Sequence, residues 1–286
     1  MLLLRHARRR LSVSSVRQEL SKCTTASQVE TLALNTPLQE FGPSEVAATI
    51  KLLKQLDCEN AKAVDRLLGH LEREKLPPSQ VAELCSVVSV VPQFLLKQVG
   101  DNLHKFSGKD FVKLVGALSH NQEALLRRIA MEISKRRVLT DFDLNDMISL
   151  LAKYEDLGIQ SLELCEKVSD EIFVLEDLKP LKAADFTRLV NCFAVWEYKD
   201  KDLFDKFTEE LVVRRLELDD FTNQDFQVIM DGLLSLGYDC NELGNKFSSE
   251  MEARVTKAFF RKWNKVVYAC VGTGCLFIVL PPLLGI

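Results

Sequence analysis

The chain has 286 residues, of which 47% are hydrophobic and 27% charged, with 12 glycines and 8 prolines. This apolar content excludes a disordered chain, and the scarcity of glycine and proline favours an all-α protein over short strands joined by tight turns. The formal net charge is -4, but residues 1–22 hold six basic residues and one acid, which leaves 31 basic and 40 acidic residues, or -9, for the body. A body this acidic repels a phosphate backbone unless its basic residues gather on one face.

The N-terminal segment, residues 1–22, is rich in arginine and has no acid before Glu19. This composition is typical of a mitochondrial transit peptide. In a secretory signal the charges precede the apolar core, whereas here the leucines come first. The alternative is a basic amphipathic helix that lies on anionic lipid or on a partner.

Residues 23–252 repeat a two-helix unit. Each copy begins with an acid or amide followed by an apolar residue, continues with helical apolar spacing, and precedes a second amphipathic stretch. The copies start at positions separated by 35, 30, 33, 42 and 40 residues, namely Val46, Val81, Phe111, Leu144, Phe186 and Phe226. This is the period of helical-hairpin solenoids, in which neighbouring units stack to bury a shared core. We therefore predict about six units and a surface suited to binding.

Three of the predicted helix starts carry a hydroxyl side chain three residues before an acid. They are Ser107-x-x-Asp110, Thr140-x-x-Asp143 and Thr222-x-x-Asp225. This spacing resembles a capping box with Asp in place of Glu, so it predicts where the helices begin.

The repeated units D-F-x-x-[LIM]-[VM]-x-x-[LF], above all LELDDFTNQDFQVIMDGLLSLGY over residues 216–238, resemble the helical repeats of organellar RAP-type and FAST-kinase-like proteins of alveolate mitochondria. The resemblance covers roughly residues 40–252. It implies organellar RNA binding, often with a C-terminal RAP domain. In this chain an apolar segment stands in the place of that domain.

The C-terminal segment, residues 266–286, contains no charge over 21 residues, enough for a helix of roughly 31 Å, about one hydrocarbon thickness. The preceding residues, 253–265, form an amphipathic, interfacial linker with Trp263 as a belt residue and basic residues on the side that we expect to face the matrix. Pro281 and Pro282 end the regular helix near Leu280. The alternative is a final helix buried in a complex.

A belt of small residues lies within the predicted span, and such residues allow another helix to approach closely. We therefore predict that this part of the anchor docks another membrane helix. The belt comprises Ala269, Cys270, Gly272, Thr273 and Gly274.

No stretch matches a nucleotide, hydrolase, zinc or kinase motif, and the cysteines and histidines are scattered, so we expect no catalytic, cofactor-binding or metal-binding residues and no cofactor. Clustered basic residues remain to be explained. They complement helix C-terminal dipoles or, if stacking aligns them, form a stripe for cardiolipin head groups or RNA. The candidates are Arg127, Arg128, Arg136, Arg137, Arg214 and Arg215.

These features favour a non-catalytic, matrix-facing scaffold held in the mitochondrial inner membrane. Its expected partners are membrane lipid and the other protein subunits of a respiratory complex or the ATP synthase. The alternative is a mitochondrial RNA-binding or mitoribosome-associated repeat protein. A third hypothesis, an outer-membrane adaptor facing the cytosol, holds if the N-terminus is no import signal.

Overall fold

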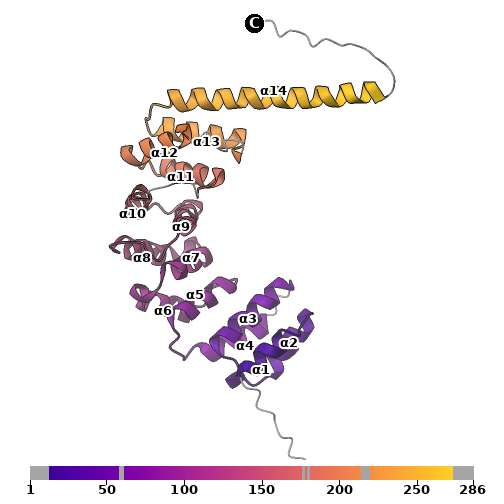
Figure 1. Ribbon diagram of the computed structural model, residues 1–286. Coiled ribbons are helices and arrows are strands. Elements are labelled where there is room, and N and C mark those ends of the chain that lie inside the picture. The colour runs from indigo at the N-terminus through magenta and orange to yellow at the C-terminus, as the bar shows by residue number, and fades with distance from the viewer. Residues whose placement is uncertain (1–12, 58–60, 176–177, 179–180, 214–219, 273–286) are drawn as a thin grey trace, which may run out of the picture. The chain divides into compact units, whose positions relative to one another are not determined.

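The computed structural model describes residues 13–57, 61–175, 178, 181–213 and 220–272 (Figure 1). Across these residues the regular structure is α-helical with three short 3-10 helices and no strand, so the prediction of an all-α chain is confirmed. The chain divides into two compact units, Met1–Leu175 and Glu176–Ile286.

Among the described residues, the first unit contains ten α-helices and the second contains four, in chain order. In the first unit they are α1 (Val13–Leu20), α2 (Ala26–Asn35), α3 (Pro43–Gln55), α4 (Ala61–Leu71), α5 (Pro78–Val87), α6 (Gln93–Asp101), α7 (Gly108–Ala117), α8 (Glu123–Ser134), α9 (Leu144–Asp156) and α10 (Leu162–Phe173), with the 3-10 helices η1 (Leu38–Glu40), η2 (Leu103–Lys105) and η3 (His120–Gln122). In the second they are α11 (Ala183–Val195), α12 (Lys201–Val213), α13 (Asn223–Ser235) and α14 (Asn241–Gly272).

Consecutive helices form pairs, and the pairs pack in two layers within each unit. In the first unit each odd-numbered helix contacts the next odd-numbered helix from α1 to α9, while α2 contacts α4 and α8 contacts α10. In the second unit α11 contacts α13, and α12 contacts α14. The sequence predicts about six pairs, whereas the residues described here form seven, because α1 and α2 add a pair at the N-terminal end.

Helix α1 lies inside the segment that the sequence assigns to targeting. Its side chains Val16 and Leu20 are buried, and it packs against α2 and α3. Arg17 Nε lies 3.9 Å from Glu45 Oε1 of α3. The second half of this basic segment is therefore part of the packed unit, while residues 1–12 lie outside the described ranges.

The predicted helix starts agree with the structure except at α9. Val46, Val81, Phe111, Phe186 and Phe226 are each the fourth residue of their helix, and the capping boxes of Ser107 and Thr222 are confirmed.

At α9 the predicted Thr140-x-x-Asp143 box is wrong. Asp143 is the N-cap itself, and its carboxylate accepts a hydrogen bond of 2.8 Å from the backbone amide of Asp146. Leu144 is therefore the first residue of the helix, and Met147 takes the position that Phe111 has in α7. An aspartate can serve as N-cap or as third residue, so the sequence spacing alone allowed both registers.

Glycine allows neighbouring helix pairs to approach closely at two of the described positions. A Cβ built on Gly232 in α13 would lie 2.8 Å from Val190 Cγ1 in α11. A Cβ on Gly108, the first residue of α7, would lie 2.6 Å from the carbonyl oxygen of Asp141 in the next pair. Because neither site has room for a side chain, glycine sets the separation of the neighbouring pairs there.

Aromatic side chains fill the core of the second unit. Phe186, Phe204 and Phe207 meet edge to face, with Phe186 and Phe204 each within 6 Å of the Phe207 centroid. Phe226 stacks on Phe247 at 4.3 Å between ring centroids, which joins α13 to α14. Each large ring removes extensive apolar area from water, so these contacts hold the two layers of the unit together.

Helix α14 is continuous over 32 residues, roughly 48 Å at the usual rise. Its first turns pack through the buried side chains of Leu243 and Phe247, and Met251 and Val255 further along are exposed. The predicted linker, residues 253–265, is thus a helical continuation of the last pair. In the part of the chain that the structure describes, no helix has the length and apolarity needed to span a bilayer.

Candidate functional site

A repeated polar contact joins each pair of helices to the pair before it. The sixth residue of a second helix donates to a backbone carbonyl that lies near the end of the preceding second helix or up to three residues beyond it. Arg66 binds the carbonyls of Ala33 and Thr36, the latter at 3.1 Å, and Arg128 Nη2 binds the Gly100 carbonyl at 2.8 Å. The last carbonyls of a helix have no partner within it, so the arginines that bind Ala33 and Gly100 supply the missing donor and complement the helix dipole.

The same position makes equivalent contacts in three further helices. Gln98 Nε2 in α6 donates to the Glu74 carbonyl at 2.8 Å, Lys167 Nζ in α10 to the Arg137 carbonyl at 2.9 Å, and Lys246 in α14 to the Leu211 carbonyl. These contacts were not predicted from the sequence. A repeated polar side chain at the sixth position of each second helix could have indicated them, once the helices are aligned from their first residue.

A second repeated contact uses arginine at the fourteenth position, counted from the start of the second helix. Arg136 donates to the Phe106 carbonyl, and its Cζ lies 4.9 Å from the ring centroid of Phe111. Arg254 donates to the Phe221 carbonyl, and its Cζ lies 5.0 Å from the ring centroid of Phe226. Each arginine therefore covers the aromatic side chain at the start of the first helix of its own pair by a cation–π contact.

Arg136 also holds the next pair in place. Its Nη1 lies 2.9 Å from Asp141 Oδ2, and the same carboxylate oxygen accepts from the backbone amide of Gly108 at the start of α7. The arginine side chain is 20% exposed, so its guanidinium is largely committed to internal partners.

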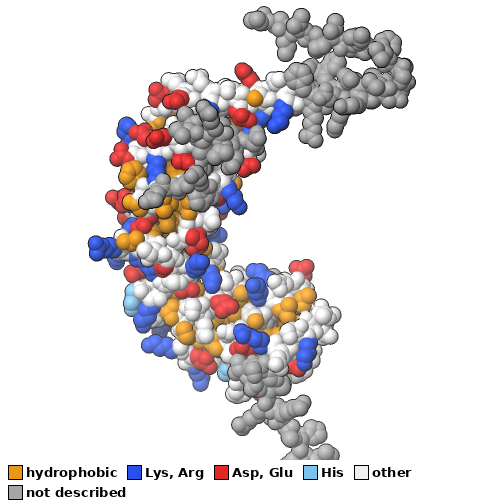
Figure 2. Space-filling model, viewed as in Figure 1, with side chains coloured by type: hydrophobic (Ala, Val, Ile, Leu, Met, Phe, Trp, Pro, Cys, Tyr) orange, Lys and Arg blue, Asp and Glu red, His pale blue; other side chains and the backbone are white. Residues whose placement is uncertain are grey.

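The predicted basic stripe is only partly available as a surface. Arg127 is exposed but contacts Glu123 at 2.8 Å and the Gln160 carbonyl at 3.2 Å. Arg137 is exposed. Arg128 and Arg136 make the contacts given above, and Arg214 and Arg215 lie outside the described residues. On the face seen in Figure 2, basic and acidic side chains are interspersed over α5 to α10 and do not gather into one basic stripe.

The predicted docking residues fall at the end of α14 and beyond it. The helical backbone includes Trp263, Ala269, Cys270 and Gly272. Thr273 and Gly274 lie outside the described ranges, as does most of the predicted membrane segment.

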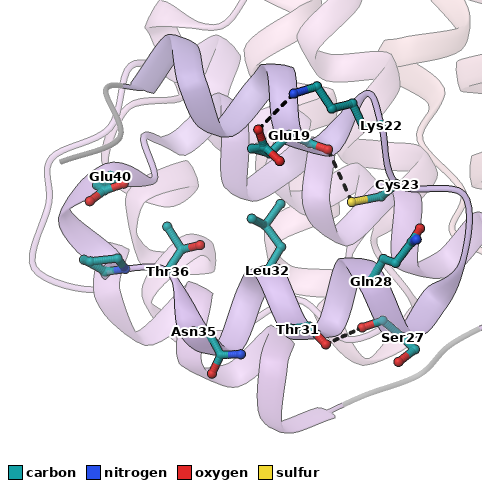
Figure 3. A pocket seen from close by; sticks show the side chains of 11 residues that line it. Glu19, Lys22, Cys23, Ser27, Gln28, Thr31, Leu32, Asn35, Thr36 and Glu40 are labelled. Carbon is teal, nitrogen blue, oxygen red and sulfur yellow. Dashed lines mark hydrogen bonds and ion pairs between the residues drawn. The ribbon is translucent and has the colours of Figure 1, made fainter. Parts of the chain in front are cut away.

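A pocket of about 530 Å³ lies between α1, α2 and η1 (Figure 3). This volume is within the range of small-molecule sites. Polar side chains of α2 form one wall, Lys22 Nζ binds Glu19 Oε1 at 3.0 Å on another, and Glu40 lies at the opposite end beside Thr36. Glu40 is 8% exposed, and its Oε2 has no hydrogen-bond partner among the residues that the structure describes.

The buried cysteines have the surroundings of core residues. Cys85, Cys165 and Cys192 are fully buried in α5, α10 and α11. Burial raises the pKa of Cys85 to about 12, so its thiol stays protonated at neutral pH. Among the described residues, no group of three or more His, Cys, Asp or Glu side chains is arranged to hold a metal ion.

Comparison with protein-family models and with curated protein sequences finds no match to this chain. The resemblance to organellar RNA-binding repeats therefore remains an expectation from the repeat pattern.

Proposed function

We propose that this chain is a non-catalytic, helical-repeat scaffold, an accessory subunit of a mitochondrial inner-membrane assembly such as a respiratory complex or the ATP synthase. Residues 266–286 would cross the membrane as a single span, and the stacked helix pairs, a helical-hairpin solenoid, would face the matrix.

The continuity of α14 carries this proposal. The helix begins in the packed core at Leu243 and Phe247 and runs without interruption to Gly272, seven residues into the uncharged segment. An anchor joined in this way transmits its orientation to the last helix pair, because an α-helix resists bending in the absence of proline or an inserted side chain. A flexible tether would instead require a break between the body and the apolar segment.

The internal use of the arginines favours a protein scaffold over an RNA-binding protein. Neutralising phosphates requires cations that are free to release counterions, whereas Arg136 is only 20% exposed, donates to the Phe106 carbonyl and is paired with Asp141. The RNA-binding alternative rests on the repeat pattern and on exposed residues such as Arg137.

Native electrophoresis of mitochondria solubilised in mild detergent tests the proposal. We expect the protein to migrate in a high-mass band together with other membrane subunits, and to resist protease until the inner membrane is opened. Migration as a free monomer would refute the scaffold role, and digestion in intact mitochondria would place the repeats on the cytosolic side. Recovery of RNA by crosslinking, with binding that weakens steeply with salt, would favour the alternative.

A further inference from the structure

The segment that contains Glu40 has a counterpart in the same chain, the segment before α9 that contains Asp141. Glu40 and Phe41 precede α3 by three and two residues, as Asp141 and Phe142 precede α9. At α9 the acid is satisfied, because Asp141 binds the guanidinium of Arg136 at 2.9 Å and accepts from the Gly108 amide. Arg136 comes from the fourteenth position of the preceding second helix, α8.

At α3 that arginine is missing from the preceding pair. The fourteenth position counted from the start of α2 is Gln39, whose uncharged side chain is exposed. The nearby Arg66 donates to the carbonyls of Ala33 and Thr36, and no ion pair within the described ranges includes Glu40. Glu40 is therefore a buried acid with no ion pair among the described residues, whereas its counterpart Asp141 is paired with Arg136.

A buried carboxylate oxygen without a donor, such as Glu40 Oε2, is unfavourable, and a guanidinium supplies both opposite charge and hydrogen bonds to it. Glu40 and Glu19 line the pocket together with the single cation Lys22, which is bound to Glu19. The lining is thus formally negative, and hydroxyl and amide groups of Thr31, Asn35 and their neighbours surround it.

We propose that this pocket binds the guanidinium group of an arginine side chain, with Glu40 as its principal partner. The arginine takes the place that Arg136 has beside Asp141. The proposal is independent of the membrane assignment, because it uses contacts of α1, α2 and η1 alone.

Methyl-labelled full-length protein in detergent, titrated with the peptide acetyl-Gly-Arg-Gly-amide, tests the site. We expect shifts at the methyl groups of Leu32 and Thr31, both of which line the pocket, and no shifts with the citrulline peptide, which has the same shape without the charge. Glu40→Gln should weaken binding by roughly tenfold or more, the loss expected for a hydrogen bond to a charged group. The matched control Glu132→Gln, an acid on α8, should leave binding unchanged.

A gain-of-contact variant keeps the test valid if Glu40→Gln fails to fold. Asn35→Arg places a guanidinium at the pocket wall and should block the peptide while raising the melting temperature.

The source of the arginine is tested by replacing Arg5, Arg8, Arg9 and Arg10 together with glutamine. Tighter peptide binding by this variant than by the natural chain would show that the chain's own arginines compete for the site, and equal binding would assign the site to a partner. Binding unaffected by Glu40→Gln, or no peptide binding to either chain, would overturn the proposal.

Discussion

At the level of single residues, Arg136 illustrates how one side chain can connect two helix pairs. It joins the Phe106 carbonyl, the Phe111 ring and the Asp141 carboxylate, which belong to two successive helix pairs. Few side chains other than arginine could make these contacts together, because they need a planar cation with several donors. The residue is thus better explained by folding than by binding.

Replacing Arg136 with Met keeps much of the apolar stem but removes all three polar contacts. We expect a loss of about 2 kcal/mol in the free energy of unfolding, since a carbonyl loses its charged donor and a cation–π contact disappears. Denaturant unfolding followed by circular dichroism measures this change. The control Arg137→Met, one residue further on and exposed, should change stability by less than about 0.5 kcal/mol. Equal losses in the two variants would contradict the assignment.

Asp225 predicts a pH dependence of stability. Burial raises its pKa, but hydrogen bonds from the Thr222 amide and hydroxyl and from the Thr187 hydroxyl outweigh this effect, so the pKa is lowered overall. A carboxyl with a depressed folded-state pKa stabilises the fold above its unfolded pKa of about 3.9, and this stabilisation is lost as the pH falls through the folded value.

Asp225→Asn should therefore lower stability at pH 7 by roughly 1 kcal/mol, the usual contribution of a capping interaction. Below about pH 4 the difference between the variant and the natural chain should shrink. Thermal unfolding between pH 7 and pH 2.5 measures both effects. Asp231→Asn, at an exposed acid on the same helix, serves as control. If the stability of the natural chain and that of Asp225→Asn change with pH in the same way, Asp225 does not cause the pH dependence.

At the level of helices, apolar periodicity was enough to place the first helices of six pairs, five of them in register. The sixth was displaced by three residues because both Asp143 and Asp146 suit a capping position. The α1–α2 pair was missed because α1 lies in the basic segment 1–22, whose composition suggested a targeting peptide. Val16 and Leu20 nevertheless stand four residues apart on one buried face. A short amphipathic helix in a presequence and a short helix in a fold have the same pattern, so composition could not distinguish them.

The packing of α1 makes a prediction about processing. Removing residues 1–22 should cost more stability than removing residues 1–12, because only the longer truncation deletes the buried Val16 and Leu20 of α1. Burying one such side chain contributes about 1.5–3 kcal/mol, so the longer truncation should cost roughly 3–6 kcal/mol. Urea unfolding of both truncated chains measures this difference. If both are equally stable, the packing of α1 contributes nothing to the fold.

The candidate sites were harder to predict than the helices. Clusters of arginine were visible in the sequence, but whether a guanidinium faces solvent or a carbonyl of the preceding pair depends on stacking. Arg66, Arg128 and Lys167 share the sixth position of their helices, but only the stacking of the pairs shows that each meets a backbone carbonyl of the preceding pair. Glu40 could not be singled out for the same reason, since its low exposure of 8% is a property of the packed unit and not of its sequence neighbours.

For the whole molecule, stability should follow from contacts between neighbouring pairs, because each helix packs against those one or two places away within its unit. In such arrays local defects remain local, since each helix depends mainly on its neighbours. Gly108 and Gly232 offer a reciprocal test, one in each unit, as each lies where a Cβ would collide with the adjacent pair.

Gly108→Ala should lower hydrogen-exchange protection in α7 to α9 and leave α11 to α14 unchanged, because the added methyl meets the Asp141 backbone. Gly232→Val should do the reverse, exposing α11 and α13 to exchange while α3 to α9 keep their protection. Overpacking of this kind costs about 1–3 kcal/mol, enough to raise local opening about fivefold to more than a hundredfold. Mass spectrometry of the two variants measures the pattern. Loss of protection throughout the chain in either variant would show that the helix pairs unfold as one cooperative body and that nearest-neighbour contacts do not govern stability.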